Sequence, residues 1–268
     1  MDAVSVLEEL RRVGKPATAV IYRRHGAHDE TWGVTYADLG RIAKLLRGRS
    51  DLAEALWASG IHDARVLATM IASPEALSRA TFDDWISAAR CRATANAVAD
   101  VGSHRADAHG IARQWIGTQD EWAGVAGWSA MASLAMGNRL DDATASELAI
   151  QIRDTVHASP NATRYAMNMA LIAIGIGCPG IRQAVLDAAG TIGKVVVTTG
   201  VPGVSRQTSC RTSSGHLPGR GESHPLARNR LRSRGHFRTR IQCLMPGLRH
   251  HPTGGGSPWR WFPRPADA

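Results

Sequence analysis

Three short motifs in this chain contain residues that could do chemistry. Gly175–Gly180 reads "GIGCPG", which matches the G-x-G-x-x-G spacing of a dinucleotide-binding turn. Gly127–Met131 reads "GWSAM" and approaches the nucleophile elbow of hydrolases, in which a serine stands between two glycines. His25–Glu30 reads "HGAHDE", and its imidazole and carboxylate groups are of the types that bind metals. What each motif can do depends on the element that carries it.

The surrounding sequence favours a structural role for all three motifs. A dinucleotide site needs a strand before its glycines and an acid about 20 residues later. Here the segment before the glycines continues a helical pattern instead of a strand. The residue that follows the next apolar run, Val195–Val197, is Thr198 and not an acid. Met131 stands where an elbow needs its closing glycine, so we expect a helix interior. We expect His25–Glu30 to be a polar loop between helices, with no bound metal and no small-molecule cofactor.

Apolar residues recur at helical spacing over most of the chain before Lys194. Helix starts are predicted where Ser or Thr has an acid three residues later, at Thr35, Thr81, Thr118 and Thr144. Helix ends are predicted at Gly48, Gly60, Gly137 and Gly177. We therefore expect about a dozen short helices and no strand before Lys194.

Three segments of the chain share one plan. Asp51–Ala72, Ile111–Ala135 and Ile150–Gly175 each read as a helix, a short polar turn and a more apolar, Ala-rich helix. Similar helical hairpins that cannot bury their apolar faces alone indicate a stacked α-solenoid of helical repeats. The predicted fold class is therefore all-α, and an ordinary helical bundle is the alternative.

The positive charge of the chain is confined to its C-terminal part. The net charge is +9, but residues 1–197 hold twenty Lys and Arg against twenty-one Asp and Glu. From Thr198 onward there are twelve Arg against two acids. Any affinity for DNA in the helical part must therefore come from a local patch rather than from net charge.

Cysteine usage and hydropathy indicate a cytoplasmic protein without a membrane segment. The four Cys form no C-x-x-C pair, and the N-terminus lacks the apolar core of a secretion signal, so we expect reduced thiols. The most apolar stretch, Met169–Ile176, is far shorter than the roughly 20 residues that a membrane span needs.

Three phrases of the chain resemble a known family. "ALWASGIHDARVLATMIA" (Ala55–Ala72), "TRYAMNMALIAIG" (Thr163–Gly175) and "AAGTIGKVVV" (Ala188–Val197) are similar to the DNA alkylation repair enzymes, the HEAT-like (AlkD-like) DNA glycosylases. The resemblance covers roughly residues 5–197 and implies a solenoid that cradles duplex DNA and excises alkylated, positively charged purines. It implies DNA with alkylated bases as the partner, and we expect a monomer.

The family's catalytic residues are replaced at several matching positions. The family has a Trp and, four residues later, an Asp; these positions hold Arg92 and Asn96. The family's further Arg and Trp fall on Val125 and Met169. Asn96 keeps the shape of an Asp but lacks the charge that would stabilise a developing cation. Asp100, four residues later on the same helix face, is the candidate substitute carboxylate; a solvated surface acid is the alternative.

The resemblance also implies residues that contact DNA. Arg65, Arg113 and Arg164 lie in or beside the repeat helices, where the family would bind phosphates, and Tyr22 is a candidate DNA-facing aromatic. An ion pair of Arg65 with Asp63 or Glu54 is an equally plain interpretation.

Two functions follow from these residues. The first is binding of duplex DNA at alkylated bases, with N-glycosidic hydrolysis if a carboxylate serves. The second is a catalytically inactive DNA- or protein-binding scaffold, which the exchange of the acid for Asn96 favours. Release of methylated purines distinguishes them.

Residues 198–268 are rich in Arg, Pro, Gly and Ser and have no apolar period, so we expect a disordered tail. Our hypothesis is that this segment is translated out of frame. Loss of one G from GAC-CAC-GG, which encodes the Asp-His-Gly that follows "GKVVV" in the family, gives the Thr-Thr-Gly found at residues 198–200. A similar shift yields Val204–Ser209 from Cys-Lys-Pro-Pro-Asp-Val. The alternative is a basic arm that binds DNA by charge alone.

Overall fold

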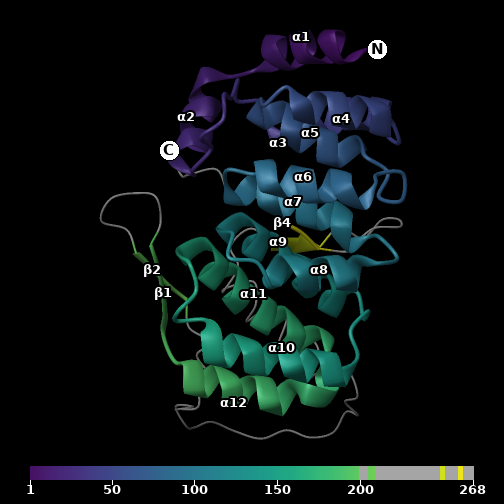
Figure 1. Cartoon of the computed structure of the whole chain (residues 1–268). Coiled ribbons are helices and arrows are strands. Elements are labelled where there is room, and N and C mark those ends of the chain that lie inside the picture. Colours follow the sequence, from purple (N-terminus) through teal and green to yellow (C-terminus); the bar gives the residue numbers. More distant parts are fainter. Residues whose placement is uncertain (199–204, 209–247, 251–258, 262–268) are drawn as a thin grey trace, which may run out of the picture. The chain divides into compact units, whose positions relative to one another are not determined.

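The computed structural model describes residues 1–198, 205–208, 248–250 and 259–261, and twelve α-helices lie within these ranges (Figure 1). The chain divides into two compact units, Met1–Thr212 and Ser213–Ala268, and every described helix belongs to the first. In the second unit, β3 (Leu248–His250) pairs antiparallel with β4 (Trp259–Trp261). The predicted disorder and out-of-frame origin of residues 198–268 fall mostly outside the described residues.

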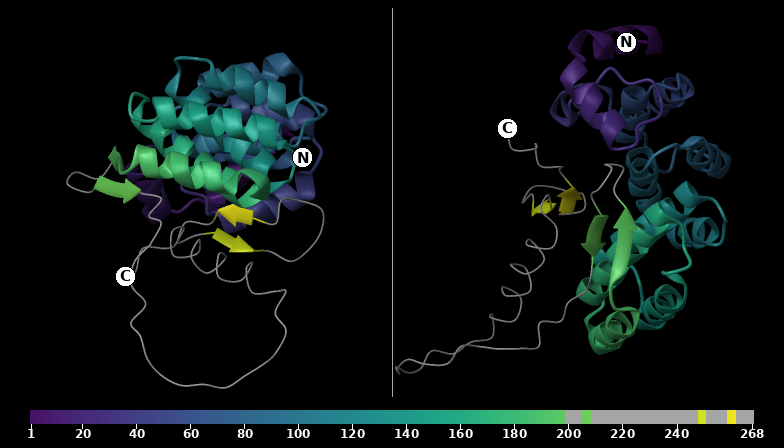
Figure 2. Two further views of the ribbon diagram at one scale, coloured as in Figure 1. Left: turned by 90° about the horizontal axis from the view of Figure 1, so that it is seen from below. Right: turned by 90° about the vertical axis from the view of Figure 1, so that its left-hand side faces the viewer.

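Twelve helices make up most of the described residues of the first unit, and Figure 2 shows them from two further directions. They are α1 (Ala3–Val13), α2 (Pro16–Arg24), α3 (Tyr36–Leu46), α4 (Ser50–Ala58), α5 (His62–Ile71), α6 (Arg79–Ala88), α7 (Arg92–Ser103), α8 (Ala108–Ile116), α9 (Glu121–Met136), α10 (Asp142–Thr155), α11 (Asn161–Gly177) and α12 (Arg182–Ile192). A short 3₁₀ turn, Pro179–Ile181, joins the last two. The all-α prediction is confirmed for this unit.

Helix ends were predictable from the sequence, whereas three of the four predicted N-cap residues are displaced. The α3 start is confirmed, because the Thr35 hydroxyl accepts a hydrogen bond from the Asp38 backbone N–H at 3.2 Å. A helix also begins near Thr81, Thr118 and Thr144, but none of these threonines is its N-cap. The N-cap residues there are Ser78, Asp120 and Asp141. All four glycine ends are confirmed to within two residues.

The helices pack as pairs around one row. Helices α3, α5, α7, α9 and α11 each contact the next, and we call them the central row. Helices α4, α8 and α10 each pack against the central helix that follows them in the chain, as α6 does against α7. The three predicted helical hairpins correspond to α4–α5, α8–α9 and α10–α11, and a single hydrophobic core runs through the central row and the helices packed against it.

The apolar character of α11 is used in packing against α9. Gly177 lies so close to the end of α9 that a Cβ there would stand 2.1 Å from the Ala135 carbonyl oxygen. Gly177 is the last residue of α11 and Gly180 lies in the turn that leads into α12, so "GIGCPG" ends a helix as predicted, although Gly175 is inside α11. "GWSAM" is likewise interior to α9.

No single helix of the described residues meets the length and hydropathy of a membrane span; α11 and Pro179–Ile192 do so only together, across a 105° bend.

A buried carboxylate fixes the loop between α2 and α3. Asp63 of α5 is fully buried, and its oxygens accept hydrogen bonds from the Thr31 hydroxyl (2.9 Å) and the backbone N–H groups of Trp32 (2.7 Å) and Val34 (2.8 Å). Between them, Gly33 has a φ of 76°, and a Cβ there would lie 2.3 Å from the Ala19 backbone nitrogen. The loop can therefore approach α2 only with glycine at this position.

A strand pair follows the last helix. Strand β1 (Val195–Thr198) pairs antiparallel with β2 (Ser205–Thr208), with Val195 opposite Thr208. The Asn161 side-chain amide donates to the Thr198 carbonyl at 2.9 Å, and its oxygen accepts from the Thr198 N–H at 2.8 Å. The start of α11 thereby holds the end of β1, and the first compact unit continues past Val197.

We predict that Asp63→Asn lowers the free energy of unfolding by about 1.5 to 3 kcal/mol, the range for hydrogen bonds to a charged group. An amide has one acceptor oxygen, and its NH2 group would face backbone donors that it cannot satisfy. Urea unfolding monitored by circular dichroism measures the change. Asp100→Asn is the matched control, because Asp100 is exposed, and it should leave the midpoint unchanged. Equal stability of both variants would contradict the role given to Asp63.

Candidate nucleic-acid interface

One side of α7 carries polar side chains that are not buried. Arg92, Asn96 and Asp100 follow one another at intervals of four residues and therefore share a helix face. The next two helices of the central row add Ser129 from α9 and Tyr165 from α11, both partly exposed. We call these five residues the α7–α11 face.

Arg92 of α7 reaches the aromatic ring of α11. The guanidinium carbon lies 4.7 Å from the centroid of the Tyr165 ring, a cation–π contact. Within the described part of the chain, the Arg92 guanidinium has no ion pair and no hydrogen-bond acceptor. Its N–H donors are therefore available to an external anion. The sequence identified Arg92 as a departure from the family, but it gave no sign of the contact with Tyr165.

Asn96 is joined to the next helix of the central row. The Ser129 hydroxyl donates to the Asn96 side-chain oxygen at 2.9 Å, so the Asn96 amide NH2 group points elsewhere. An amide in this position offers donors, whereas a carboxylate would offer only acceptors. The position that the resemblance assigns to a catalytic acid therefore presents hydrogen-bond donors.

Asp100 lies about two helical turns from Arg92, with an exposed side chain. Its backbone carbonyl accepts from Ser103, but no hydrogen bond or ion pair involves its carboxylate among the described residues. Val125, which matches the family's Arg, is fully buried, and Met169 is partly buried. The face thus retains one free carboxylate and lacks both of those side chains.

Two of the predicted DNA contacts are engaged inside the protein. The Arg65 guanidinium pairs with Asp29 at 2.6 Å, rather than with Asp63 or Glu54, and lies 5.3 Å from the Trp57 ring centroid. Only 13% of the Arg65 side chain is exposed. The Tyr22 hydroxyl donates to the Val34 carbonyl at 2.7 Å, and burial raises the pKa of this phenol well above its usual value. Phosphate contact by either residue would require these bonds to break.

The other two predicted arginines are also paired. Arg113 of α8 forms an ion pair with Glu147 of α10 at 2.8 Å. Arg164 of α11 donates to the Val196 carbonyl at 2.9 Å and to the Ser159 carbonyl at 3.1 Å, and so holds β1 against the helix. The structure does not bring Tyr22, Arg65, Arg113 and Arg164 together with the α7–α11 face as one set of contacts, and their binding to DNA stays a prediction.

A cysteine and a histidine meet at the start of α7. The Cys91 sulfur lies 4.0 Å from Nδ1 of His62, and both side chains are buried. Burial alone would raise the pKa of the Cys91 thiol, but hydrogen bonds with His62 and Thr94 lower it. The contact with His62 joins α5 to the start of α7. Cys91 is only 2% exposed, so its thiol is not accessible to a substrate.

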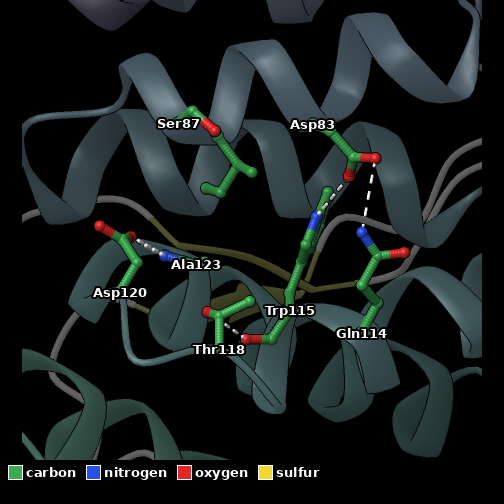
Figure 3. A pocket seen from close by; sticks show the side chains of 8 residues that line it. Asp83, Ser87, Gln114, Trp115, Thr118, Asp120 and Ala123 are labelled. Atoms are coloured by element: carbon green, nitrogen blue, oxygen red, sulfur yellow. Dashed lines mark hydrogen bonds between the residues drawn. The ribbon is translucent and has the colours of Figure 1, made fainter.

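A cavity of about 270 Å³ lies between α6, α8 and the start of α9 (Figure 3). Its carboxylates serve the fold: Asp83 accepts from the Trp115 indole N–H at 3.2 Å, and Asp120 caps α9 through the Ala123 N–H at 2.7 Å. Two acids in the lining make this cavity unsuitable for phosphate. The cavity therefore does not share the anion-binding character of the α7–α11 face.

Comparisons with known proteins identify the family and the fold of the helical part of the chain. A sequence model described as "DNA alkylation repair enzyme" matches residues 6–192. A solved structure, described as belonging to a new family of proteins related to the HEAT-like repeat DNA glycosylases with affinity for branched DNA structures, is 32% identical with a TM-score of 0.73. The match covers 78% of this chain and 90% of that one, and it confirms the predicted HEAT-like repeat fold.

Two uncharacterized proteins of Listeria are also similar to this chain. Lin0241 of Listeria innocua is 28% identical over 209 residues, which is 76% of this chain and 89% of that protein. Lmo0209 of Listeria monocytogenes is 28% identical over 198 residues, which is 72% of this chain and 87% of that protein.

We predict that Arg65→Ala lowers the free energy of unfolding by about 2 kcal/mol, somewhat less than for a fully buried ion pair, because it leaves Asp29 without its partner. Denaturant unfolding of Arg65→Ala, Asp29→Ala and the double variant measures this loss. The double variant should lose less stability than the sum of the losses in the two single variants, because either single change already breaks the ion pair. Unchanged stability combined with weaker DNA binding would instead make Arg65 a phosphate contact.

Proposed function

This chain belongs to the DNA alkylation repair enzyme family, and we propose that it binds branched DNA through the α7–α11 face without excising bases. The observation that carries the proposal is the set of donors on this face. Arg92 and the Asn96 amide present N–H groups where the resemblance implies a Trp and a catalytic Asp.

The Arg92 guanidinium is suited to a phosphate. Stacking over Tyr165 restricts the side chain without using any of its five N–H donors, so less conformational entropy is lost when an anion binds. The planar guanidinium can donate two parallel hydrogen bonds to one phosphate. Such contacts fix the position of DNA and read no sequence.

The Asn96 amide supports binding and not hydrolysis. Excision of a cationic base requires stabilisation of positive charge that develops on the sugar, and a carboxylate provides this electrostatically. A neutral amide whose oxygen already accepts from Ser129 cannot provide it. The free NH2 group can instead donate to a phosphate or a base edge.

One relative favours branched DNA as the ligand. The solved structure with 32% identity belongs to a family described by its affinity for branched DNA structures. Residues 1–197 are nearly neutral, so their net charge attracts DNA weakly. A branched DNA brings phosphates of several strands close together, so that more of them can reach one local group of donors.

We predict that Arg92→Ala weakens binding to a four-way DNA junction about tenfold and reduces the slope of log affinity against log salt by about one, as expected for one lost phosphate contact. Fluorescence anisotropy with the full-length protein and excess linear competitor measures both quantities. Arg153→Ala on α10 is the matched control, because it removes one arginine that pairs with Asp154 at 2.7 Å. Equal losses in the two variants would mean that only net charge matters.

Base excision is the second candidate function, and Asp100 is the observation that keeps it. Its carboxylate is exposed and shares the face with Arg92. Our proposal predicts that saturating wild-type protein releases no methylated purine from alkylated duplex DNA above background, as measured by chromatography of the free base. Release that Asp100→Ala abolishes, with DNA binding intact, would establish excision with Asp100 as the acid and contradict the proposal.

A further inference from the structure

We propose that α2 is a wedge that contacts unstacked bases at the branch point of DNA, an inference that rests on the proposed function. Its exposed side bears Ala17, Val20 and Ile21, with Arg24 one turn further along. The spacing i, i+3, i+4 and i+7 places these four side chains in one stripe. We call them the α2 stripe.

The α2 stripe is an apolar surface that the protein leaves uncovered. Val20 is 51% exposed and Ile21 is 45% exposed, and with Ala17 they form a group on one helix face rather than scattered single residues. In the whole of α2, Ala19 is the one buried residue. The helix therefore contributes little to the core of the first unit, and its apolar side chains face outward.

The surroundings of the stripe carry positive charge. Arg23 and Arg24 are exposed and have no carboxylate partner within the part of the chain that the structure describes, and α2 itself contains no acid. Lys15, just before the helix, lies 3.7 Å from Asp38. A surface that combines aliphatic side chains with unpaired arginines matches a partner with exposed apolar faces and negative charge, and DNA with unstacked bases has both.

The helix is fixed in place on the side opposite the stripe. The Tyr22 hydroxyl donates to the Val34 carbonyl at 2.7 Å, and Ala19 lies against Gly33. The same loop is bonded to the buried Asp63 of α5. Because this anchoring uses residues about 180° around the helix from the α2 stripe, the stripe projects away from the protein on a rigid support.

A rigid apolar stripe selects for a branch. In a continuous duplex the base faces are stacked and inaccessible, and insertion of a side chain must first unstack a step. In the open form of a four-way junction, the base pairs at the branch point are not stacked on a neighbouring arm, so Val20 and Ile21 can be buried against them without that cost. Val20 and Ile21 would therefore add affinity for branched DNA and none for linear duplex, whereas Arg24 can contact phosphates of either DNA.

The test compares the double variant V20S/I21S with wild-type protein on a four-way junction and on a linear duplex of the same sequence. We expect junction affinity to fall about tenfold and duplex affinity to stay unchanged, because only the junction offers apolar surface to the stripe. Ile150→Ser is the matched control, since Ile150 on α10 is 50% exposed. The double variant R23A/R24A should weaken binding to both DNAs and lower the salt dependence.

A fluorescent base reports on the contact directly. With 2-aminopurine at the branch point, wild-type protein should change the emission on binding, and V20S/I21S at saturation should not. An unchanged ratio of junction to duplex affinity in V20S/I21S would overturn the wedge while leaving DNA binding through Arg92 intact. Sedimentation with phosphatidylserine vesicles tests a membrane instead. If wild-type protein sediments with the vesicles and V20S/I21S does not, while both bind the junction equally well, the stripe contacts a membrane surface and the wedge is overturned. Absence of DNA binding by wild-type protein would overturn the proposed function itself.

Discussion

The central constraint on this protein is that its central-row helices cannot be stable alone. Ten of the sixteen residues of α9 are buried, on all sides of the helix, so it must be covered by α7, α8 and α11 at once. Burial of this kind sets the spacing of the row. The spacing in turn brings Asn96 to Ser129 and lets Arg92 extend to Tyr165 on α11. The polar face follows from the apolar packing below it.

The same packing separates arginines that serve the fold from arginines that can serve a ligand. Arg65 and Arg164 lie between elements, where their donors are used by a carboxylate or by backbone carbonyls. Arg92 is held by an aromatic face and keeps its donors. Because residues 1–197 have almost no net charge, any affinity for DNA in this part must depend on such placement rather than on the number of arginines.

The fold was largely predictable because periodicity and glycine ends act locally. Some N-cap residues were misassigned for a local reason as well: Ser78 and Asp141 are caps with a threonine three residues later, and Ser, Thr and Asp all suit a cap. The site was only partly predictable. The polar residues of α7 could be named, but contacts such as Arg65 with Asp29 join residues far apart in sequence and depend on the exact stacking of helices.

Photo-crosslinking tests the central claim, that branched DNA lies on the α7–α11 face, most directly. A four-way junction with 5-iodouracil beside the branch would be irradiated with the full-length protein, and the crosslinked peptides would be identified by mass spectrometry. The account predicts crosslinks to α11 at Tyr165, lost on competition with unlabelled junction. Crosslinks confined to α8 and α10, or to Ser213–Ala268, would contradict it.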